Sequence, residues 1–288
     1  MVRLSGGRFR MGSDRHYPEE APARTVTVPG FWIDRAPVTN REFAAFAEAT
    51  GYRTVAELPP DSGAYPDADP AGLVPGSLVF RLPASRPSAG MGAMRSWGDW
   101  WAFVPGAHWR HPDGSARPCE PDHPAVHVAH ADAAAYAAWA GKALPTEAEW
   151  EFAARGGEDR GEYAWGDELA PGGVHQANTW QGRFPNENTV EDGFDGTSPV
   201  GAFPANGYGL LDMIGNVWEW TDDPWPGRGG HPCCGPAPAS GIGRRVIKGG
   251  SHLCAPNHCR RYRPAARQPQ AVDSGTGHLG FRCVRREA

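Results

Sequence analysis

The order of hydrophobic and polar positions predicts strands at the beginning of the chain and helices after them. The stretches 7–13 (GRFRMGS) and 24–39 (RTVTVPGFWIDRAPVT) are short and alternating, with turn residues between them, which is typical of strands. Two further segments, 39–51 and 130–142, carry apolar residues at helical spacing. We therefore expect a few short strands, then two helices separated by a long stretch of chain.

Residues that begin and end helices support these assignments. Thr39 or Asn40 is a suitable N-cap for the first helix, and Gly51 is a suitable stop. The second helix, which is rich in alanine, has Gly141 at its end. Both helices are thus bounded by residues with a known physical role at helix termini.

A third helix is predicted over 144–157 (LPTEAEWEFAARGG). Thr146 and Glu149 have the spacing of a capping box, and a pair of glycines ends the segment. After this helix we find only short strands, turns and loops. The pattern predicts an irregular α+β fold, poor in regular secondary structure and formed by a single domain over residues 1–288.

One segment interrupts this domain. Residues from about 58 to 92 are rich in Pro, Gly and Ala, and they predict a long irregular insertion. Long loops in compact domains are often functional, but a variable surface loop explains the same composition. The sequence leaves both interpretations open.

Composition limits the function. The chain has 288 residues, 40% hydrophobic composition and a net charge of -5, from 28 basic and 33 acidic residues without a basic tract. This distribution gives no reason to expect a nucleic-acid partner. The first residues lack the apolar region of a signal peptide, and no apolar run is long enough to span a bilayer. We expect a soluble, cytoplasmic monomer without a membrane partner.

Cysteines gather near the end of the chain. The six cysteines stand at Cys119, Cys233, Cys234, Cys254, Cys259 and Cys283. A chain of this length with so few cysteines is not a disulfide scaffold, and a reducing cytosol would keep most of them as thiols. The adjacent pair 233–234 could bridge only with strain, so we expect free thiols there. Reactive or metal-bound sulfur is more plausible than a structural bridge.

The densest chemical cluster is KGGSHLCAPNHCRRYRPAAR, residues 248–267. It brings His252, Cys254, His258 and Cys259 together, with a turn between the two cysteines. A local disulfide or two inert buried thiols would explain the pair, and so would a redox or metal site. Zinc usually requires four ligands, whereas two thiolates suit a soft monovalent ion, above all Cu(I). The arginines that follow would favour the thiolate form, although they could also simply pair with carboxylates.

Hard oxygen donors form a second cluster. Residues 191–196 (EDGFDG) resemble a calcium loop, although the spacing is not that of an EF-hand, and a solvated Asp-Gly turn is the commoner explanation. Further along, Glu219 lies between Trp218 and Trp220. A carboxylate in that position is expected to be partly buried and to need a partner, either a metal or an arginine.

Several longer motifs make the sequence similar to the formylglycine-generating enzymes, also called sulfatase-modifying factors. The resemblance extends over nearly the whole chain and includes PVTNREFAAF, LPTEAEWEFAARGG, ANTWQGRFP, NGYGLLDMIGNVWEWT, GGSHLC and DSGTGHLGFRC. LPTEAEWE and GNVWEWT also occur in a wider superfamily and indicate only the fold. The two cysteines after GGS are much more specific to the enzymes themselves.

This resemblance implies an α+β fold related to C-type lectins and a copper-dependent oxidase. The expected substrate is the cysteine of a C-x-P-x-R motif in an unfolded sulfatase polypeptide. Dioxygen and Cu(I) would oxidise this cysteine, whose sulfur is thought to join the copper, and hydrolysis of the resulting thioaldehyde would give formylglycine.

The resemblance also implies roles for individual residues. Cys254 and Cys259 would bind copper, and Ser251 and Trp218 would line the reaction pocket. A calcium ion would be held by Asn178 and Asp192 side chains with the carbonyls of Thr179 and Phe194. A second calcium or other ion would be held by Asp212 and Glu219 side chains with the carbonyls of Gly215 and Val217.

The chain departs from the family pattern in three respects. His258 stands where many members have Tyr, so an imidazole could bind the metal or carry protons. Asp212 stands where many members have Asn, which makes that site more anionic. Vertebrate members have further cysteines where this chain has Ala137, Ala154 and Pro264, so Cys283 lacks a disulfide partner. These differences indicate a bacterial, cytoplasmic form.

Two other functions remain alternatives. A non-haem iron sulfoxide synthase uses the same scaffold, but it would need an additional N-terminal domain with a histidine triad, and this chain begins directly at the scaffold. A lectin-like binding module without catalysis would not need two cysteines after GGS.

Overall fold

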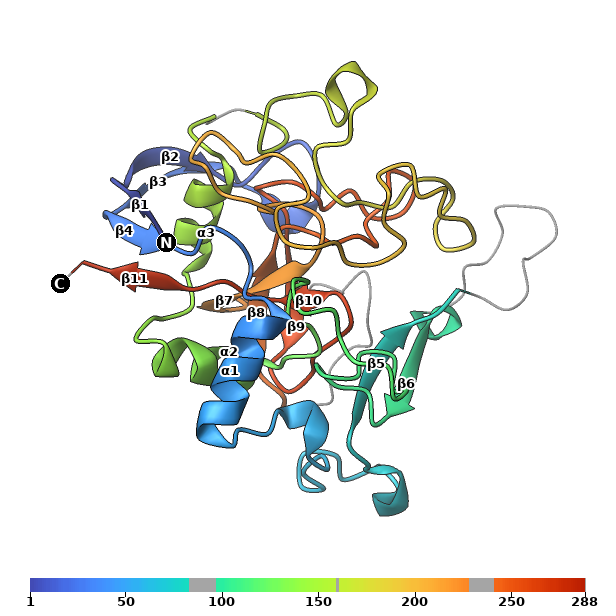
Figure 1. Ribbon diagram of the computed structural model, residues 1–288. Helices are drawn as coiled ribbons and strands as arrows, with labels where there is room; N and C mark the ends of the chain where they lie inside the picture. Colours follow the sequence, from blue (N-terminus) through green and yellow to red (C-terminus); the bar gives the residue numbers. More distant parts are fainter. Residues whose placement is uncertain (83–96, 159–160, 228–240, 288) are drawn as a thin grey trace.

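The computed structural model describes residues 1–82, 97–158, 161–227 and 241–287 (Figure 1). At its centre lies a four-stranded sheet with the order β10-β7-β8-β9. The strands are β7 (Trp218–Pro224), β8 (Arg244–Lys248), β9 (Arg267–Ala271) and β10 (Leu279–Gly280). β7, β8 and β9 pair antiparallel, whereas β10 runs parallel to β7. The residues that follow β8 lead directly to the cysteine pair.

A second sheet brings the two ends of the chain together. β1 (Val2–Leu4) and β11 (Val284–Arg286) both pair antiparallel with β4 (Phe31–Ile33). Next to it, β2 (Gly7–Met11) and β3 (Arg24–Val28) form a two-stranded ribbon. These segments confirm the strands predicted over 7–13 and 24–39. Both termini lie on the same side of the molecule (Figure 1).

The three predicted helices are confirmed in the described ranges, and their caps explain their bounds. α1 (Asn40–Thr50) has a complete capping box from Thr39 and ends at Gly51, whose φ of 67° is left-handed. α3 (Glu147–Ala154) has the predicted box between Thr146 and Glu149. α2 (His130–Trp139) ends slightly before the predicted glycine. None of the helices in the described ranges is long and apolar enough to cross a membrane.

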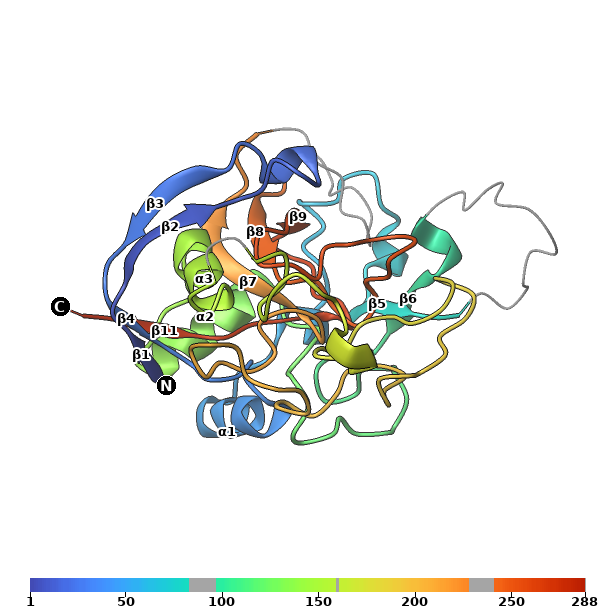
Figure 2. The same cartoon turned by 90° about the horizontal axis from the view of Figure 1, so that it is seen from above.

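These helices surround the central sheet. α3 contacts β7 and β8 on one side and β2 and β3 on the other, while α1 packs on α2 (Figures 1 and 2). The remaining short turns are 3-10 helices: η1 (Pro18–Glu20), η2 (Val55–Glu57), η3 (Pro70–Gly72), η4 (Trp97–Asp99) and η5 (Pro171–Gly173). The large share of loop outside the helices and strands agrees with the predicted irregular α+β fold.

The segment expected to be an irregular insertion contains a strand. β5 (Gly76–Phe80) pairs antiparallel with β6 (Trp101–Pro105), and this hairpin lies on the opposite side of the molecule from β1 and β4 (Figure 2). The prediction of irregular structure over 58–92 is therefore wrong at 76–80. The rest of that prediction falls partly at 83–92, outside the described residues, as do Cys233 and Cys234.

Candidate active site

The two cysteines after β8 meet as a buried pair. Cys254 and Cys259 are fully buried, and their sulfur atoms lie 3.5 Å apart as free thiols. A turn brings them together, because the backbone N–H of Cys259 donates to the carbonyl of Ala255 at 3.0 Å. The backbone N–H of Ser251 also donates to the Cys254 sulfur, at 3.4 Å. The predicted proximity of the two sulfurs is present, and the alternative of a local disulfide is not.

The glycines before the pair allow a close approach of two chain segments. Gly249 and Gly250 have φ values of 94° and 72°, which favour glycine. A Cβ on Gly250 would lie 2.7 Å from the carbonyl oxygen of Arg261. Any larger residue would therefore push the loop that carries Cys254 away from the segment that follows Cys259.

A guanidinium group lies beside Cys259. Arg261 Nη1 approaches the Cys259 sulfur at 3.8 Å. The same side chain forms an ion pair with Glu19, and it lies 3.7 Å above the ring of Tyr17. A fixed positive charge near a thiol favours thiolate, the form that binds metals. Sequence reasoning identified the surrounding arginines as a group, but it did not identify their acidic partners.

The N-terminal segment holds the region after Cys259 in place through a second ion pair. Arg263 donates to both oxygens of Glu20, with distances of 2.8 and 2.5 Å. Both side chains are almost completely buried. Because a buried charge needs a partner, this pair ties η1 firmly to the segment that carries the cysteine. In the sequence, the corresponding signal is the pair of consecutive glutamates, Glu19 and Glu20.

The two histidines of the cluster are held by groups around the pair. His258 stacks on Phe184, with ring centroids 4.4 Å apart and an angle of 8° between the planes. Trp100 contacts the same imidazole edge-on at 5.7 Å. The His252 Nδ1 donates to the carbonyl of Asn216 at 2.9 Å, and burial lowers the pKa of His252. His258 thus packs as an aromatic ring against Phe184 and Trp100.

Ser251 and Trp218, the other predicted pocket residues, are both buried. Ser251 Oγ accepts a hydrogen bond from the backbone N–H of Leu253 at 3.2 Å. Trp218 opens β7, and its indole Nε1 has no hydrogen-bond partner in the part of the chain that the structure describes. Buried N–H groups are usually paired, so this donor is suited to a polar group that enters the site.

The first predicted calcium site brings its residues together. The Asp192 carboxylate accepts hydrogen bonds from the backbone N–H groups of Thr179, at 3.1 Å, and Phe194, at 3.0 Å. The Asn178 amide donates to the carbonyl of Gly196 at 2.8 Å, while its Oδ1 is buried without a hydrogen-bond partner among the described residues. An unpaired amide oxygen on Asn178, next in sequence to the Thr179 N–H that binds the Asp192 carboxylate, fits a hard cation such as Ca²⁺.

Side chains alone would not complete such a site. In the described ranges, no group of three or more His, Cys, Asp or Glu residues is arranged to hold a metal ion. A cation at Asn178 and Asp192 would therefore depend on amide and backbone oxygens, as the resemblance implies. Likewise, the thiols of Cys254 and Cys259 fit a metal that accepts few, soft ligands.

The residues of the second predicted metal site fit an arginine better than a metal. Glu219 Oε2 accepts from Arg282 Nε at 2.7 Å and from Trp150 Nε1 at 2.8 Å, while Oε1 accepts from Arg282 Nη2 at 2.8 Å. Glu219 and Arg282 are fully buried. Of the two partners that the sequence left open for Glu219, the structure provides the arginine.

The other members of that site agree with this assignment. Burial raises the pKa of Asp212 to about 6, and its Oδ2 accepts from the backbone N–H of Gly201 at 2.7 Å. Gly215 and Val217 would contribute only their backbone carbonyls to such a metal site. The charge of Glu219 is already balanced, so we derive no metal chemistry from this site.

Comparison with known proteins shows the family to which the chain belongs. The family model described as sulfatase-modifying factor enzyme 1-like domain matches residues 1–287. The chain therefore belongs to the sulfatase-modifying factor family.

Its relatives are more specific in name. The chain is 57% identical over 295 residues to the formylglycine-generating enzyme of Mycobacterium tuberculosis, covering 99% of this chain and 97% of the relative. It is 48% identical to the formylglycine-generating enzyme of Thermomonospora curvata, with 99% and 92% of the two chains covered. Among solved structures, PvdO from Pseudomonas aeruginosa has a TM-score of 0.63 at 27% identity, covering 99% of this chain and 94% of PvdO.

Proposed function

We propose that this protein is a formylglycine-generating oxidase, which converts the cysteine of a C-x-P-x-R motif in an unfolded sulfatase polypeptide to formylglycine. The observation that carries the proposal is the pair of buried sulfurs of Cys254 and Cys259, 3.5 Å apart. The names of the relatives support the same reaction. We further propose that the chain is a monomer with a single domain. It would act in the cytoplasm, where thiols remain reduced.

The metal that fits this pair is Cu(I), held by the Cys254 and Cys259 sulfurs. When bound, copper would supply the electron-transfer chemistry by which dioxygen oxidises the substrate cysteine. The chain itself would keep both sulfurs out of water and position them. Arg261, 3.8 Å from the Cys259 sulfur, would stabilise negative charge on it. The Trp218 indole N–H and the Ser251 hydroxyl would face the reacting groups.

The two alternatives are less well supported. A lectin-like module gives no reason for two adjacent buried sulfurs beside a guanidinium. A sulfoxide synthase would bind iron through a histidine triad, which gives no reason for the buried pair of Cys254 and Cys259 sulfurs. The proposed calcium at Asn178 and Asp192 would have a structural role, because it would tie the loop around 192 to residue 178.

The test is a Cu(I) competition titration, with turnover of a C-x-P-x-R peptide measured in parallel. Cys254→Ser and Cys259→Ser should each abolish tight copper binding and turnover, because a serine hydroxyl is hard and stays protonated at neutral pH. Cys283→Ser is the matched control, since Cys283 is another fully buried free thiol. It should bind copper like the wild type.

His252→Ala and His258→Ala extend the titration. Both variants should retain copper if the two sulfurs are the ligands. Loss of copper from either would instead indicate a mixed nitrogen and sulfur site. Full turnover in a cysteine variant, or in wild-type protein stripped of copper, would contradict the proposed function.

A further inference from the structure

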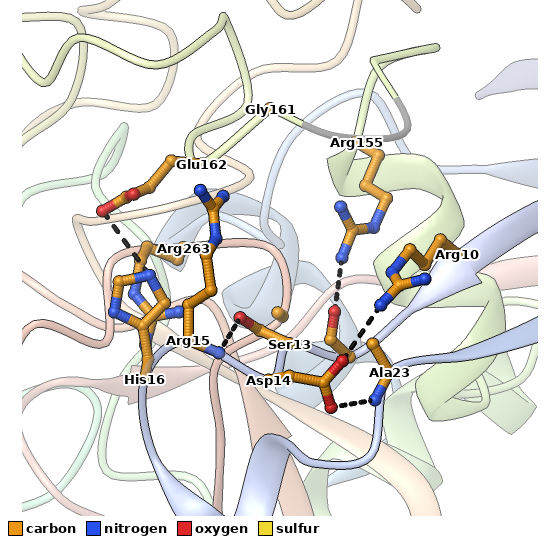
Figure 3. Close-up of a pocket in the computed structure, with 12 residues that line it drawn as sticks. Arg10, Ser13, Asp14, Arg15, His16, Ala23, Arg155, Gly161, Glu162 and Arg263 are labelled. Carbon is orange, nitrogen blue, oxygen red and sulfur yellow. Dashed lines mark hydrogen bonds and ion pairs between the residues drawn. The ribbon is translucent and has the colours of Figure 1, made fainter.

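A pocket lined by arginines lies between the N-terminal segment and the chain that follows α3. Its volume is about 330 Å³, and its lining includes Arg10, Arg15, Arg155 and Arg263 (Figure 3). The acidic side chains in the lining are Asp14 and Glu162. Neither Cys254 nor Cys259 lines the pocket. Whatever binds here is therefore separate from the proposed copper site.

The inner arginines form a fixed wall. Arg155 pairs with Glu151 at 2.7 Å, and Arg263 pairs with Glu20 at 2.5 Å. All four side chains are at least nine-tenths buried. Arg155 Nη2 also donates to the carbonyl of Gly12 at 3.2 Å. These ion pairs hold the two guanidinium groups in place before any ligand arrives.

The outer arginines are held differently. Arg10 pairs with Asp14 at 3.0 Å, but both side chains are about half exposed, and such pairs contribute little. The guanidinium of Arg15 has no hydrogen bond or ion pair in the part of the chain that the structure describes. Only the backbone N–H of Arg15 is engaged, with Ser13 Oγ at 3.2 Å. Figure 3 shows the Arg15 side chain extending from this loop toward Glu162.

Glu162 does not neutralise Arg15. Its carboxylate pairs with Arg260 at 3.1 Å and lies 3.6 Å from His16 Nε2. With the other charges among the described lining residues already paired, Arg15 is the surplus cation of this part of the pocket. Arg10 lines the pocket as well, and its pair with Asp14 is exposed to solvent.

We propose that this pocket binds a tetrahedral oxyanion, phosphate or sulfate, through the guanidinium groups of Arg15 and Arg10. Arginine suits this class of ligand, because its planar fork donates two parallel hydrogen bonds to an oxyanion. Arg155 and Arg263, each paired with a glutamate, form a rigid part of the lining. The pocket volume exceeds that of a single oxyanion, so it leaves room for water or for a larger molecule that carries the oxyanion.

The experiment is isothermal titration calorimetry of the intact chain with inorganic phosphate, sulfate, acetate and chloride at constant ionic strength. The variants are Arg15→Ala, Arg15→Lys and the control Arg41→Ala. Arg41, on α1, is also an exposed arginine, and it pairs with Asp122. Its removal changes the net charge by the same amount as the removal of Arg15. Thermal melting of each variant without added anion checks that it folds.

We expect saturable binding of phosphate or sulfate to the wild type and to Arg41→Ala, weakened at least tenfold in Arg15→Ala. Arg15→Lys should recover part of the affinity, because it keeps the charge without the fork. Comparison of phosphate with sulfate identifies the preferred source of the oxyanion. Binding that is equal in Arg15→Ala and the wild type would overturn the proposal. So would acetate or chloride binding as tightly as phosphate and sulfate.

Discussion

Replacing Arg282 by methionine tests whether an arginine, and not a metal ion, balances the buried Glu219. Arg282 donates to both oxygens of Glu219, at 2.7 and 2.8 Å, and both side chains are fully buried. Arg282→Met leaves the carboxylate with Trp150 as its remaining side-chain donor. Removing one partner of a buried ion pair costs about 3–5 kcal/mol, which corresponds to a fall in Tm of roughly 5–8 °C for a chain of this size.

The chain contains a matched control. Arg286 pairs with Glu149 through two hydrogen bonds of similar length, 2.8 and 2.7 Å, but its side chain is 43% exposed. Arg286→Met should therefore cost only about 1 kcal/mol or less. The double variant Arg282→Met with Glu219→Gln should recover stability, because glutamine carries no charge to leave unpaired.

The assay is denaturant unfolding of each variant, with and without added calcium. A loss in Arg282→Met no larger than that in Arg286→Met would refute the reasoning. Recovery of Arg282→Met by calcium alone would show that a metal ion does balance Glu219, and the second predicted metal site would then be correct after all.

Three further predictions concern calcium, pH and substrate. Calcium at 100 times its Kd should stabilise the fold by about 2.7 kcal/mol, measured as a shift in Tm. Asp192→Ala should abolish this shift, whereas Asp195→Ala, at the exposed end of the same turn, should preserve it. An equal shift in both variants would exclude the site. Burial raises the pKa of Asp132 to about 6, so its stabilising contribution is complete below the unfolded pKa near 4 and is lost as pH rises through 6. Asp132→Asn should remove this slope, at most ~3 kcal/mol, from unfolding measured between pH 4 and 7, and an unchanged slope would contradict the assignment. A short C-x-P-x-R peptide should be turned over nearly as well as an unfolded sulfatase fragment, and turnover of folded sulfatase alone would refute binding in an extended form.

Helices could be predicted from the sequence because their signals are local. Thr146 and Glu149 form the predicted capping box, and Thr39, one of the two predicted N-cap residues, forms a second box with Glu42. The β5–β6 hairpin was missed for the opposite reason. Its strands pair Gly76 with Pro105 across a long intervening segment, and no short turn motif joins them. In the described part of that segment, 58–82, proline and glycine hid the strand β5 among the loops.

The residues of the candidate site also divide into those that a local pattern predicts and those that it does not. Cys254 and Cys259 were found because one turn of chain brings their sulfurs together. The ion pairs around the predicted sites join residues far apart in the sequence: Glu19 pairs with Arg261 beside Cys259, and Arg282 pairs with Glu219. Only the folded chain shows which acid meets which arginine, because composition and spacing do not encode pairings over such distances.

The ion pair between Glu20 and Arg263 joins residues 243 positions apart. During synthesis, Glu20 leaves the ribosome long before its partner exists, by roughly 12–50 s at about 5–20 residues per second. Until then the segment that positions Cys259 has no anchor, and β11, the C-terminal strand that pairs with β4, has not been made. The working site is therefore among the last parts of the molecule to assemble. A shortened chain that ends before Arg263 would have both cysteines but should lack the arrangement that makes them useful.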